Sequence, residues 1–167
     1  MCRFFRWKKR QKKTIIPIIV SNDERLVRFI LSPLHFKNGK LRSNAFNPSV
    51  NSDEISVTRL DYSSAEECKI LAHKMDSIDS TPPKHYSGFC LLNKAIAIRC
   101  GSKDVIWSPK VDNHAHSDII MPAPRADKNT PIPAEIQEVI DNLRDQSRYF
   151  EDPQPEAQEW KGEPLTI

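Results

Sequence analysis

The stretch EISVTRLDYSSAEECKILAHKMDSI, residues 54–78, changes its hydrophobic period halfway along. Its first part, EISVTRLDY, alternates apolar and polar residues, and this period of two predicts a strand. Its second part carries apolar residues at helical spacing. It predicts a helix over residues 64–78 with a buried stripe of Cys68, Leu71, Ala72, Met75 and Ile78. A strand and a helix are therefore expected in direct succession.

Serine and glutamate residues mark the start of this helix. Ser63 and Ser64 precede Glu66 and Glu67 at the spacing of overlapping capping boxes. In a capping box the serine hydroxyl and the glutamate carboxylate bind backbone N–H groups that the first helical turn leaves free. The helix is therefore expected to begin at about residue 64.

Three further elements are expected before this stretch. The β-branched run TIIPIIV, residues 14–20, predicts a strand, which Pro17 confines to an edge or a bulge. Asn38 and Gly39 form the dipeptide typical of a tight hairpin. Between them, a short helix over residues 22–31 is predicted, with a cap at Ser21 or Asn22 and a buried stripe of Leu26, Val27, Phe29 and Ile30.

The segments after residue 78 predict more strands and a last helix. YSGFCLLNKAIAIRC, residues 86–100, indicates two strands that meet near Asn93, and DVIW, residues 104–107, indicates a third. Residues 122–133 have the composition of an exposed Pro-rich linker. The helix predicted after it has a buried face of Ile136, Ile140 and Leu143.

These elements together predict an α+β fold. We expect a single mixed or mainly antiparallel sheet of about five or six strands, with two or three helices packed on one face. The chain has 167 residues, which suffices for one hydrophobic core. The expected organisation is a basic aromatic arm over residues 1–13, one domain over residues 14–150 and an acidic disordered tail over residues 151–167.

Cysteine usage and hydropathy indicate the compartment. The chain has four cysteines and no C-x-x-C pair, which favours free thiols in a reducing, cytoplasmic environment. The apolar runs are far shorter than the roughly 20 residues needed to cross a bilayer, so no membrane span is expected.

Charge is distributed unevenly along the chain. The arm, MCRFFRWKKRQKK, carries seven Lys and Arg and no acid, while residues 151–167 carry five acids and one Lys. The arm can bind nucleic acid, a membrane surface or an acidic protein partner, or it can be a solvated extension. Its candidate binding residues are Arg3, Arg6, Trp7, Lys8, Lys9 and Arg10. Elsewhere Arg28, Arg59 and Arg99 have apolar neighbours, which places them at the rim of the core or around an anion.

The segment VDNHAHSDII, residues 111–120, holds the main candidate for chemistry. In an extended strand Asp112, His114, His116 and Asp118 would form one polar row. His114 and His116 could then bind Zn or another divalent metal and activate water for hydrolysis. The alternatives are a solvated polar face without a cofactor and a metal-free acid/base site.

Other signatures of catalysis are missing from the sequence. H-E-x-x-H, the zinc deaminase pattern, G-x-S-x-G and the phosphate-binding glycine loops do not occur. A third ligand for the histidine pair would have to come from a loop, through His35 or His85. The polar row is therefore isolated among the motifs of this chain.

The pieces RLVRFILSPLHF, AFNPS, ISVTRLD and DNHAHSDI occur in this order between residues 24 and 120. They resemble a group of small uncharacterised bacterial proteins with an R-F-I helix, an S-V-x-R strand and an H-A-D-I-like element. The resemblance implies one domain of bacterial, intracellular origin, with a setting in mobile-element or phage-defence operons. Ser117 replaces the alanine of the last element, and His114 is additional to it.

Two functions from different classes follow. The leading hypothesis is a non-catalytic accessory or interaction subunit of an intracellular bacterial complex, in a phage-defence setting, which docks a partner protein or nucleic acid through its charged ends. The alternative is a metal-dependent hydrolase or nuclease that uses Asp112, His114, His116 and Asp118.

Overall fold

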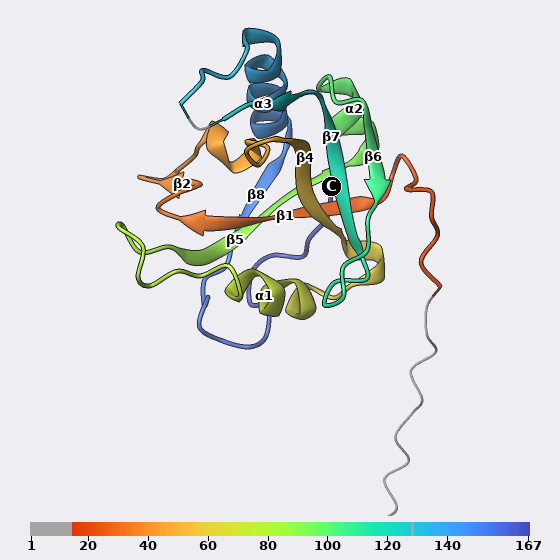
Figure 1. Cartoon of the computed structure of the whole chain (residues 1–167). Helices are drawn as coiled ribbons and strands as arrows, with labels where there is room; N and C mark the ends of the chain where they lie inside the picture. The colour runs from red at the N-terminus through yellow and green to blue at the C-terminus, as the bar shows by residue number, and fades with distance from the viewer. Residues whose placement is uncertain (1–14, 128) are drawn as a thin grey trace, which may run out of the picture.

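A computed structural model describes residues 15–127 and 129–167, and its centre is a six-stranded antiparallel sheet (Figure 1). The strand order is β6-β7-β4-β1-β5-β8, and two further strands, β2 and β3, form a separate hairpin. The strands of the large sheet are β1 (Arg25–Ser32), β4 (Ser52–Arg59), β5 (His85–Asn93), β6 (Asp104–Trp107), β7 (His116–Arg125) and β8 (Arg148–Glu151). The helices are α1 (Ala65–His73), α2 (Lys94–Arg99) and α3 (Ala134–Gln146), with two 3-10 turns, η1 (Ser43–Phe46) and η2 (Leu60–Tyr62). The predicted α+β class is confirmed.

The sequence predicts a helix over residues 22–31, but the structure has strand β1 there. This strand lies between β4 and β5, near the middle of the sheet. Leu26 and Ile30 join the hydrophobic cluster on one face, and Val27 and Leu31 join the cluster on the other. A strand that is buried on both faces is a continuous apolar run, and such a run also contains the i, i+3, i+4 spacing of a helix. The helix prediction is therefore wrong, and the reason is burial on two sides.

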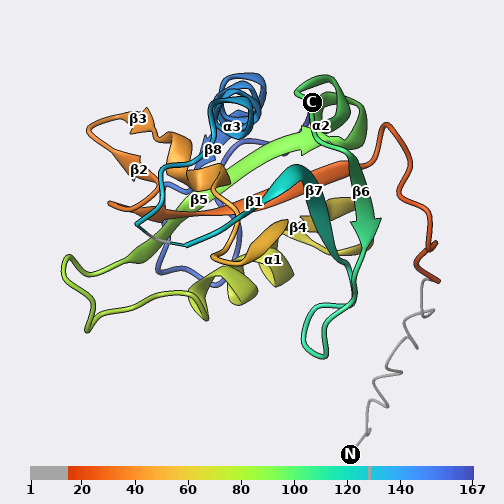
Figure 2. The same ribbon diagram turned by 45° about the horizontal axis from the view of Figure 1, so that its top comes forward.

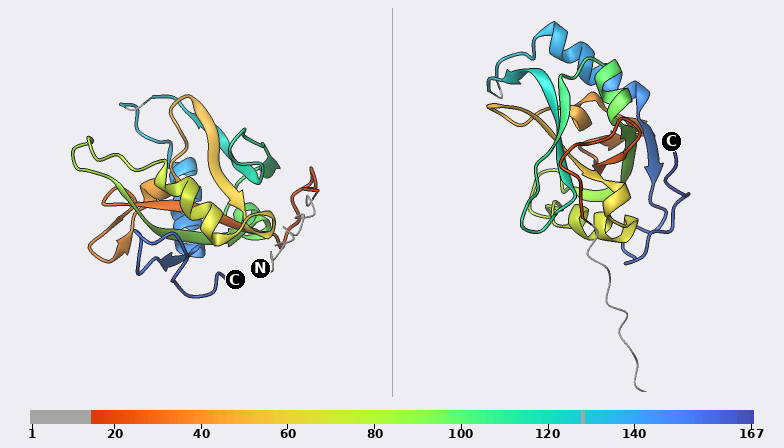
Figure 3. Two further views of the ribbon diagram at one scale, coloured as in Figure 1. Left: turned by 90° about the horizontal axis from the view of Figure 1, so that it is seen from below. Right: turned by 90° about the vertical axis from the view of Figure 1, so that its right-hand side faces the viewer.

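Helices cover both faces of the sheet, not one as predicted. Helices α2 and α3 pack on the face that carries Leu26, while α1 packs on the opposite face (Figure 2). Seen from below, α1 and the segment after β8 lie on the same side of the sheet (Figure 3, left). The molecule therefore has two hydrophobic cores that are separated by β1 and β5.

Helix α1 begins as predicted and ends earlier. Ser64 Oγ accepts the amide of Glu67 at 3.1 Å, and the Glu67 carboxylate accepts the amide of Ser64 at 2.8 Å, so the capping box is confirmed. The helix ends at His73, because Asp76 accepts the amide of Tyr86 at 2.6 Å and thereby turns the chain toward β5. The predicted stripe residues beyond this point, Met75 and Ile78, are exposed.

Three more elements that the sequence predicts are present in the structure. The Asn38-Gly39 hairpin is confirmed, with φ values of 53° and 72°, and it joins β2 (Phe36–Lys37) to β3 (Lys40–Leu41). Strand β6 and helix α3 are also confirmed, and α3 buries Ile136, Val139, Ile140 and Leu143.

Three other predictions are corrected. Residues 15–20 pair with no strand in the described chain, although a strand was expected there. The second half of residues 86–100 is helix α2, because the Asn93 side chain accepts the amide of Ile96 at 2.8 Å and caps it. Strand β7 continues through Arg125, so the linker starts after the first four residues of its predicted range.

The chain after residue 150 packs on the domain and is not the disordered tail that was predicted. Asp152 forms a buried ion pair with Lys69 of α1 at 2.7 Å. Trp160 packs on Phe89 with ring centroids 5.0 Å apart, and Leu165 is buried in the same cluster. These residues complete the core on the α1 face, so the domain includes the acidic segment.

Strands β1 and β4 separate soon after they meet. Their register has two pairs, Leu26 with Arg59 and Val27 with Thr58, whereas β1 pairs with β5 along its whole length. The side chain of Arg28 lies where they diverge, and it donates from Nη1 to the carbonyl of Ser56 at 2.9 Å and from Nε to that of Ala45 at 3.0 Å. This divergence creates the opening that holds the candidate site.

Candidate functional site

The predicted polar row is divided by a turn. The backbones of Lys110 and Asn113 bond to each other at 3.0 and 3.1 Å, so residues 111–115 reverse direction and do not extend β7. Asp112 is exposed and pairs with Lys74 at 2.9 Å, while His114 is also exposed. The prediction of one continuous row is wrong, because period-two alternation persists in sequence across a chain reversal.

His116 and Asp118 remain together at the start of β7, and both are buried. His116 Nδ1 lies 2.8 Å from the carbonyl oxygen of Ser108, which assigns the Nδ1 proton to that bond. Nε2 is then an unprotonated acceptor, 3.7 Å from Asp118 Oδ1 and without a hydrogen-bond partner in the described chain. Burial lowers the pKa of His116, so the ring is neutral at pH 7.

Ser108 connects these two residues from the end of β6. Its hydroxyl lies 2.9 Å from His116 Nδ1 and donates to Asp118 Oδ2 at 2.5 Å. The Ser108 hydroxyl donates its hydrogen bond to the carboxylate and not to the imidazole. The imidazole is therefore not placed as the base for this serine, in contrast to the arrangement that activates a serine nucleophile. The network fixes His116 in one orientation on a rigid strand.

A metal site built on His114 and His116 is not assembled by the described residues. Within residues 15–127 and 129–167, no group of three His, Cys, Asp or Glu is placed to hold a metal ion. His35 is buried and accepts the amide of Leu31 at 3.2 Å, and His85 is exposed at the beginning of β5, so neither completes the pair. The arm residues Arg3, Arg6, Trp7, Lys8, Lys9 and Arg10 lie outside the described residues.

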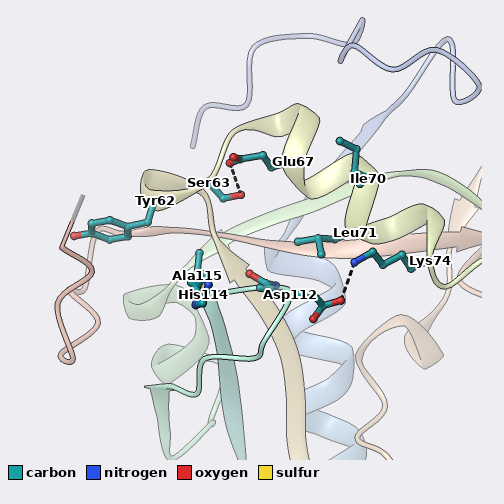
Figure 4. Close-up of a pocket in the computed structure, with 10 residues that line it drawn as sticks. Tyr62, Ser63, Glu67, Ile70, Leu71, Lys74, Asp112, His114 and Ala115 are labelled. Carbon is teal, nitrogen blue, oxygen red and sulfur yellow. Dashed lines mark hydrogen bonds and ion pairs between the residues drawn. The ribbon is translucent and has the colours of Figure 1, made fainter. Parts of the chain in front are cut away.

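Two adjoining hollows lie between α1, the diverging strands and residues 108–115. The outer hollow has a volume of about 270 Å³ and is lined by residues that include Tyr62, Leu71 and His114 (Figure 4). The inner hollow has a volume of about 320 Å³ and reaches Arg28 and His116. Lys74 extends from α1 to Asp112 on the loop, and this ion pair lines both hollows (Figure 4).

The loop that forms one wall of the inner hollow is anchored to β4. Asn113 Nδ2 donates to Thr58 Oγ1 at 2.8 Å, and both residues are buried. The amide of Arg59 donates to the carbonyl of Ala115 at 2.9 Å. These bonds fix the wall, so the hollow is formed without a rearrangement of the loop.

The three arginines singled out in the sequence do not converge. Arg99 is exposed, and Arg59 forms a buried pair with Glu24 at 2.5 Å. Arg28 alone enters the inner hollow, and in the described chain it has no acidic group within 4.0 Å. Burial lowers the pKa of Arg28 to about 10, so its guanidinium stays charged at pH 7.

A second feature is a strip of exposed isoleucines before β1. Ile15, Ile18 and Ile19, here called the isoleucine strip, are 89%, 76% and 79% exposed. Arg59 holds the backbone below them through bonds to the carbonyls of Pro17 at 2.6 Å and Ile19 at 3.4 Å. The sequence identified this segment as apolar, but only its missing strand partner leaves it at the surface.

None of the helices in the described ranges has the length and apolar character that a bilayer crossing requires. The resemblance to small bacterial proteins stays a prediction. Comparison of the chain with protein-family models, with curated proteins and with solved structures finds no match.

Proposed function

We propose that the protein is a non-catalytic interaction subunit that docks a partner protein through the isoleucine strip. The observation that supports this most is the exposure of Ile15, Ile18 and Ile19 on a segment whose backbone is fixed. Burial of one such side chain is worth about 1.5–3 kcal/mol. Burial of all three against a partner would therefore contribute several kcal/mol to an interface.

The fixed backbone favours docking over nonspecific adhesion. Arg59 is fully buried, and Glu24 binds its guanidinium at 2.5 and 2.8 Å. Its remaining bonds reach the carbonyls of Pro17 and Ile19. A segment that is ordered before binding loses less conformational entropy when a partner covers it.

The charge of the neighbouring sequence suggests the chemistry of the partner. Residues 1–13 carry seven Lys and Arg and no acid, and they directly precede the strip. The matching surface would be an apolar groove bordered by acidic side chains. A cytoplasmic bacterial complex, in the phage-defence setting that the resemblance implies, is the proposed context.

A strip variant tests this function. Ile15, Ile18 and Ile19 are changed together to Ser, and Ile78→Ser, at an isoleucine that is 84% exposed elsewhere, is the control. A partner that copurifies with the wild type is isolated, and its affinity for each purified variant is measured by calorimetry. We expect at least a tenfold loss for the strip variant and no change for the control. Equal affinity of all three proteins would contradict the proposal.

The alternative function, a metal-dependent hydrolase or nuclease, would now rest on His116 and Asp118 without the other two members of the row. This alternative predicts that the protein cleaves nucleic acid, that EDTA stops the cleavage and that His116→Ala abolishes it. Such turnover by the purified chain would replace the interaction hypothesis. Affinity for nucleic acid that falls steeply with salt and needs residues 1–13 would instead identify nucleic acid as the partner.

A further inference from the structure

We propose that the inner hollow is a binding site for a small organic anion, with Arg28 as the group that contacts its carboxylate or phosphate. This site is distinct from the isoleucine strip and does not depend on the docking function. The proposal rests on a half-buried cation that has no acidic partner within 4.0 Å among the described residues and that lies at the wall of a hollow of about 320 Å³.

Within the described residues, the hydrogen bonds of Arg28 use only two of its side-chain donors. A guanidinium has five N–H donors, and the carbonyls of Ala45 and Ser56 accept two of them. These two bonds orient the group but do not neutralise its charge. Arg59, which has a similar sequence environment, has its charge balanced by Glu24. Partial desolvation of a cation without a counter-ion costs free energy, and a bound anion would offset part of this cost.

The charged groups around Arg28 also favour an anion. Lys74, Lys110 and His116 line the same hollow, and Asp112 is the one acidic residue among its lining residues. Asp112 forms an ion pair with Lys74, so these two charges cancel. With Arg28 and Lys110 as the remaining charges, the hollow is positive.

Asp118 is the remaining acidic group near the site. It attracts Arg28 electrostatically, but it forms no ion pair with it within 4.0 Å. Ser108 donates to its Oδ2 at 2.5 Å, which holds the carboxylate beside His116. Asp118 therefore moderates the positive potential at Arg28 without occupying its donors.

The other walls define the rest of the ligand. The apolar part of the lining consists of Val27, Phe29, Val57, Leu71 and Met75. Ser49, Thr58 and Asn113 add polar groups. The volume is at the lower end of the range for small-molecule sites. A compact anion with a short apolar body fits these walls, and the planar fork of Arg28 suits a carboxylate or a phosphate.

His116 offers an acceptor at the same wall. Its Nε2 is buried and has no hydrogen-bond partner within the described residues. A ligand hydroxyl, or the proton of a monoprotonated phosphate, would satisfy this atom. Protonation of His116 at lower pH would turn the acceptor into a donor beside Arg28, and Asp118 and Lys110 also act on this titration.

Titration of the full chain with three probes tests the site. Inorganic phosphate, butyrate and butyl phosphate are added at constant ionic strength, with chloride as the reference salt, and binding is measured by calorimetry and by the thermal midpoint. We expect saturable binding of at least one organic anion and a raised midpoint. A preference for butyl phosphate over butyrate would identify the head group as phosphate, and the reverse preference would identify a carboxylate. No saturable binding of any probe would overturn the proposal.

Variants locate the binding. Arg28→Gln should weaken it at least tenfold, and Lys110→Ala, at an exposed position on the rim, by about threefold to tenfold. Lys37→Ala, on the distant hairpin, is the control and should bind like the wild type. If Arg28→Gln does not fold, two other measurements locate the bound anion. They are the affinity of Lys110→Ala and the ligand-induced shifts of the His116 ring resonances. Unchanged affinity in Lys110→Ala together with unshifted His116 resonances would place the anion elsewhere and contradict the proposal.

Discussion

His35 is a buried, uncharged histidine whose surroundings explain its state. Its Nδ1 accepts the amide of Leu31 at 3.2 Å, so the ring serves as a hydrogen-bond acceptor for the end of β1. Burial, and then the positive charge of Arg28, lowers its pKa to about 3. The protonated ring would have no acidic partner to offset its desolvation.

Stability should therefore depend on pH through His35. The folded-state pKa lies below the unfolded value of about 6.5, so the unfolded chain takes up the proton first. The stabilisation is complete above about pH 6.5 and falls as the pH drops toward 3, by up to about 1.4 kcal/mol per pH unit. Urea unfolding at pH 7.0 and 5.5 measures this slope before most carboxylates titrate.

His35→Asn is the matched variant, because its side-chain oxygen can still accept the Leu31 amide but does not titrate in this range. We expect a smaller slope between pH 7.0 and 5.5. His116, whose pKa is also lowered, accounts for part of the slope that remains. The same slope in both proteins would show that His35 is not the group that takes up the proton.

Arg28 and Arg59 show what residue-level patterns leave open. Each has apolar neighbours in the sequence, and the same two interpretations apply to both. Glu24, which neutralises Arg59, lies 35 positions away, and no acid reaches Arg28 within 4.0 Å in the described chain. Whether a buried charge is balanced depends on contacts between distant residues, so a sequence pattern can nominate an arginine but cannot assign its role.

Strands β5 and β8 approach each other so closely that one position admits only glycine. Gly88 has a φ of 153°, and a Cβ at this position would lie 2.2 Å from the carbonyl oxygen of Phe150. The obstacle is backbone of the neighbouring strand, which cannot rotate away as a side chain can. The register Gly88 with Glu151 and Phe89 with Phe150 fixes this approach.

Gly88→Ala should lower the free energy of unfolding by about 2 kcal/mol or more, because β8 must shift or the backbone must change. Gly39→Asn is the control, since nothing lies within 4 Å of a Cβ at Gly39 and asparagine tolerates its φ of 72°. The control should lose about 1 kcal/mol at most. Urea unfolding measures both, and equal losses would argue against the close approach.

Element-level predictions succeeded where one face of an element is buried and a local signal marks its ends. The capping box at Ser64 and the hairpin at Asn38 and Gly39 are such signals. Strand β1 was mistaken for a helix because both of its faces are buried. A period of two appears in the sequence only when one face of a strand is exposed and polar. No residue of β1 is fully exposed, so the sequence of this strand lacks that alternation.

Lys69 is the buried cation that connects the acidic C-terminal segment to α1. Lys69 is 1% exposed, and its ammonium group pairs with Asp152 at 2.7 Å and donates to the carbonyls of Gln154 at 2.7 Å and Glu159 at 3.1 Å. The two carbonyls accept hydrogen bonds from the ammonium group, and the Asp152 carboxylate balances its charge. They connect α1, in the first half of the chain, to the segment that covers Phe89 with Trp160.

Lys69→Met should release this segment from the molecule. Asp152 would remain buried without its partner, so we expect a loss of about 3–5 kcal/mol in the free energy of unfolding. Hydrogen exchange of residues 152–165 should accelerate before the rest of the chain does.

Lys161→Met is the control, because the pair of Lys161 with Glu159 is exposed to solvent and such pairs add little to stability. Adding Asp152→Asn to Lys69→Met should restore part of the lost stability, since no charge is then left buried. Unchanged exchange of residues 152–165 in Lys69→Met would show that the apolar contacts of Trp160 and Leu165 hold the segment without the ion pair.

Local periodicity, turn chemistry and composition are enough to predict the α+β class, helices α1 and α3, the hairpin, strands β4 and β6, and the uneven distribution of charge. Long-range packing sets which face each element buries, how residues 151–167 pack and where the polar row divides, at residues 111–115. It also brought Arg28 and His116, which are 88 positions apart, into one hollow. These features depend on contacts between residues far apart in the chain, and no local pattern encodes them.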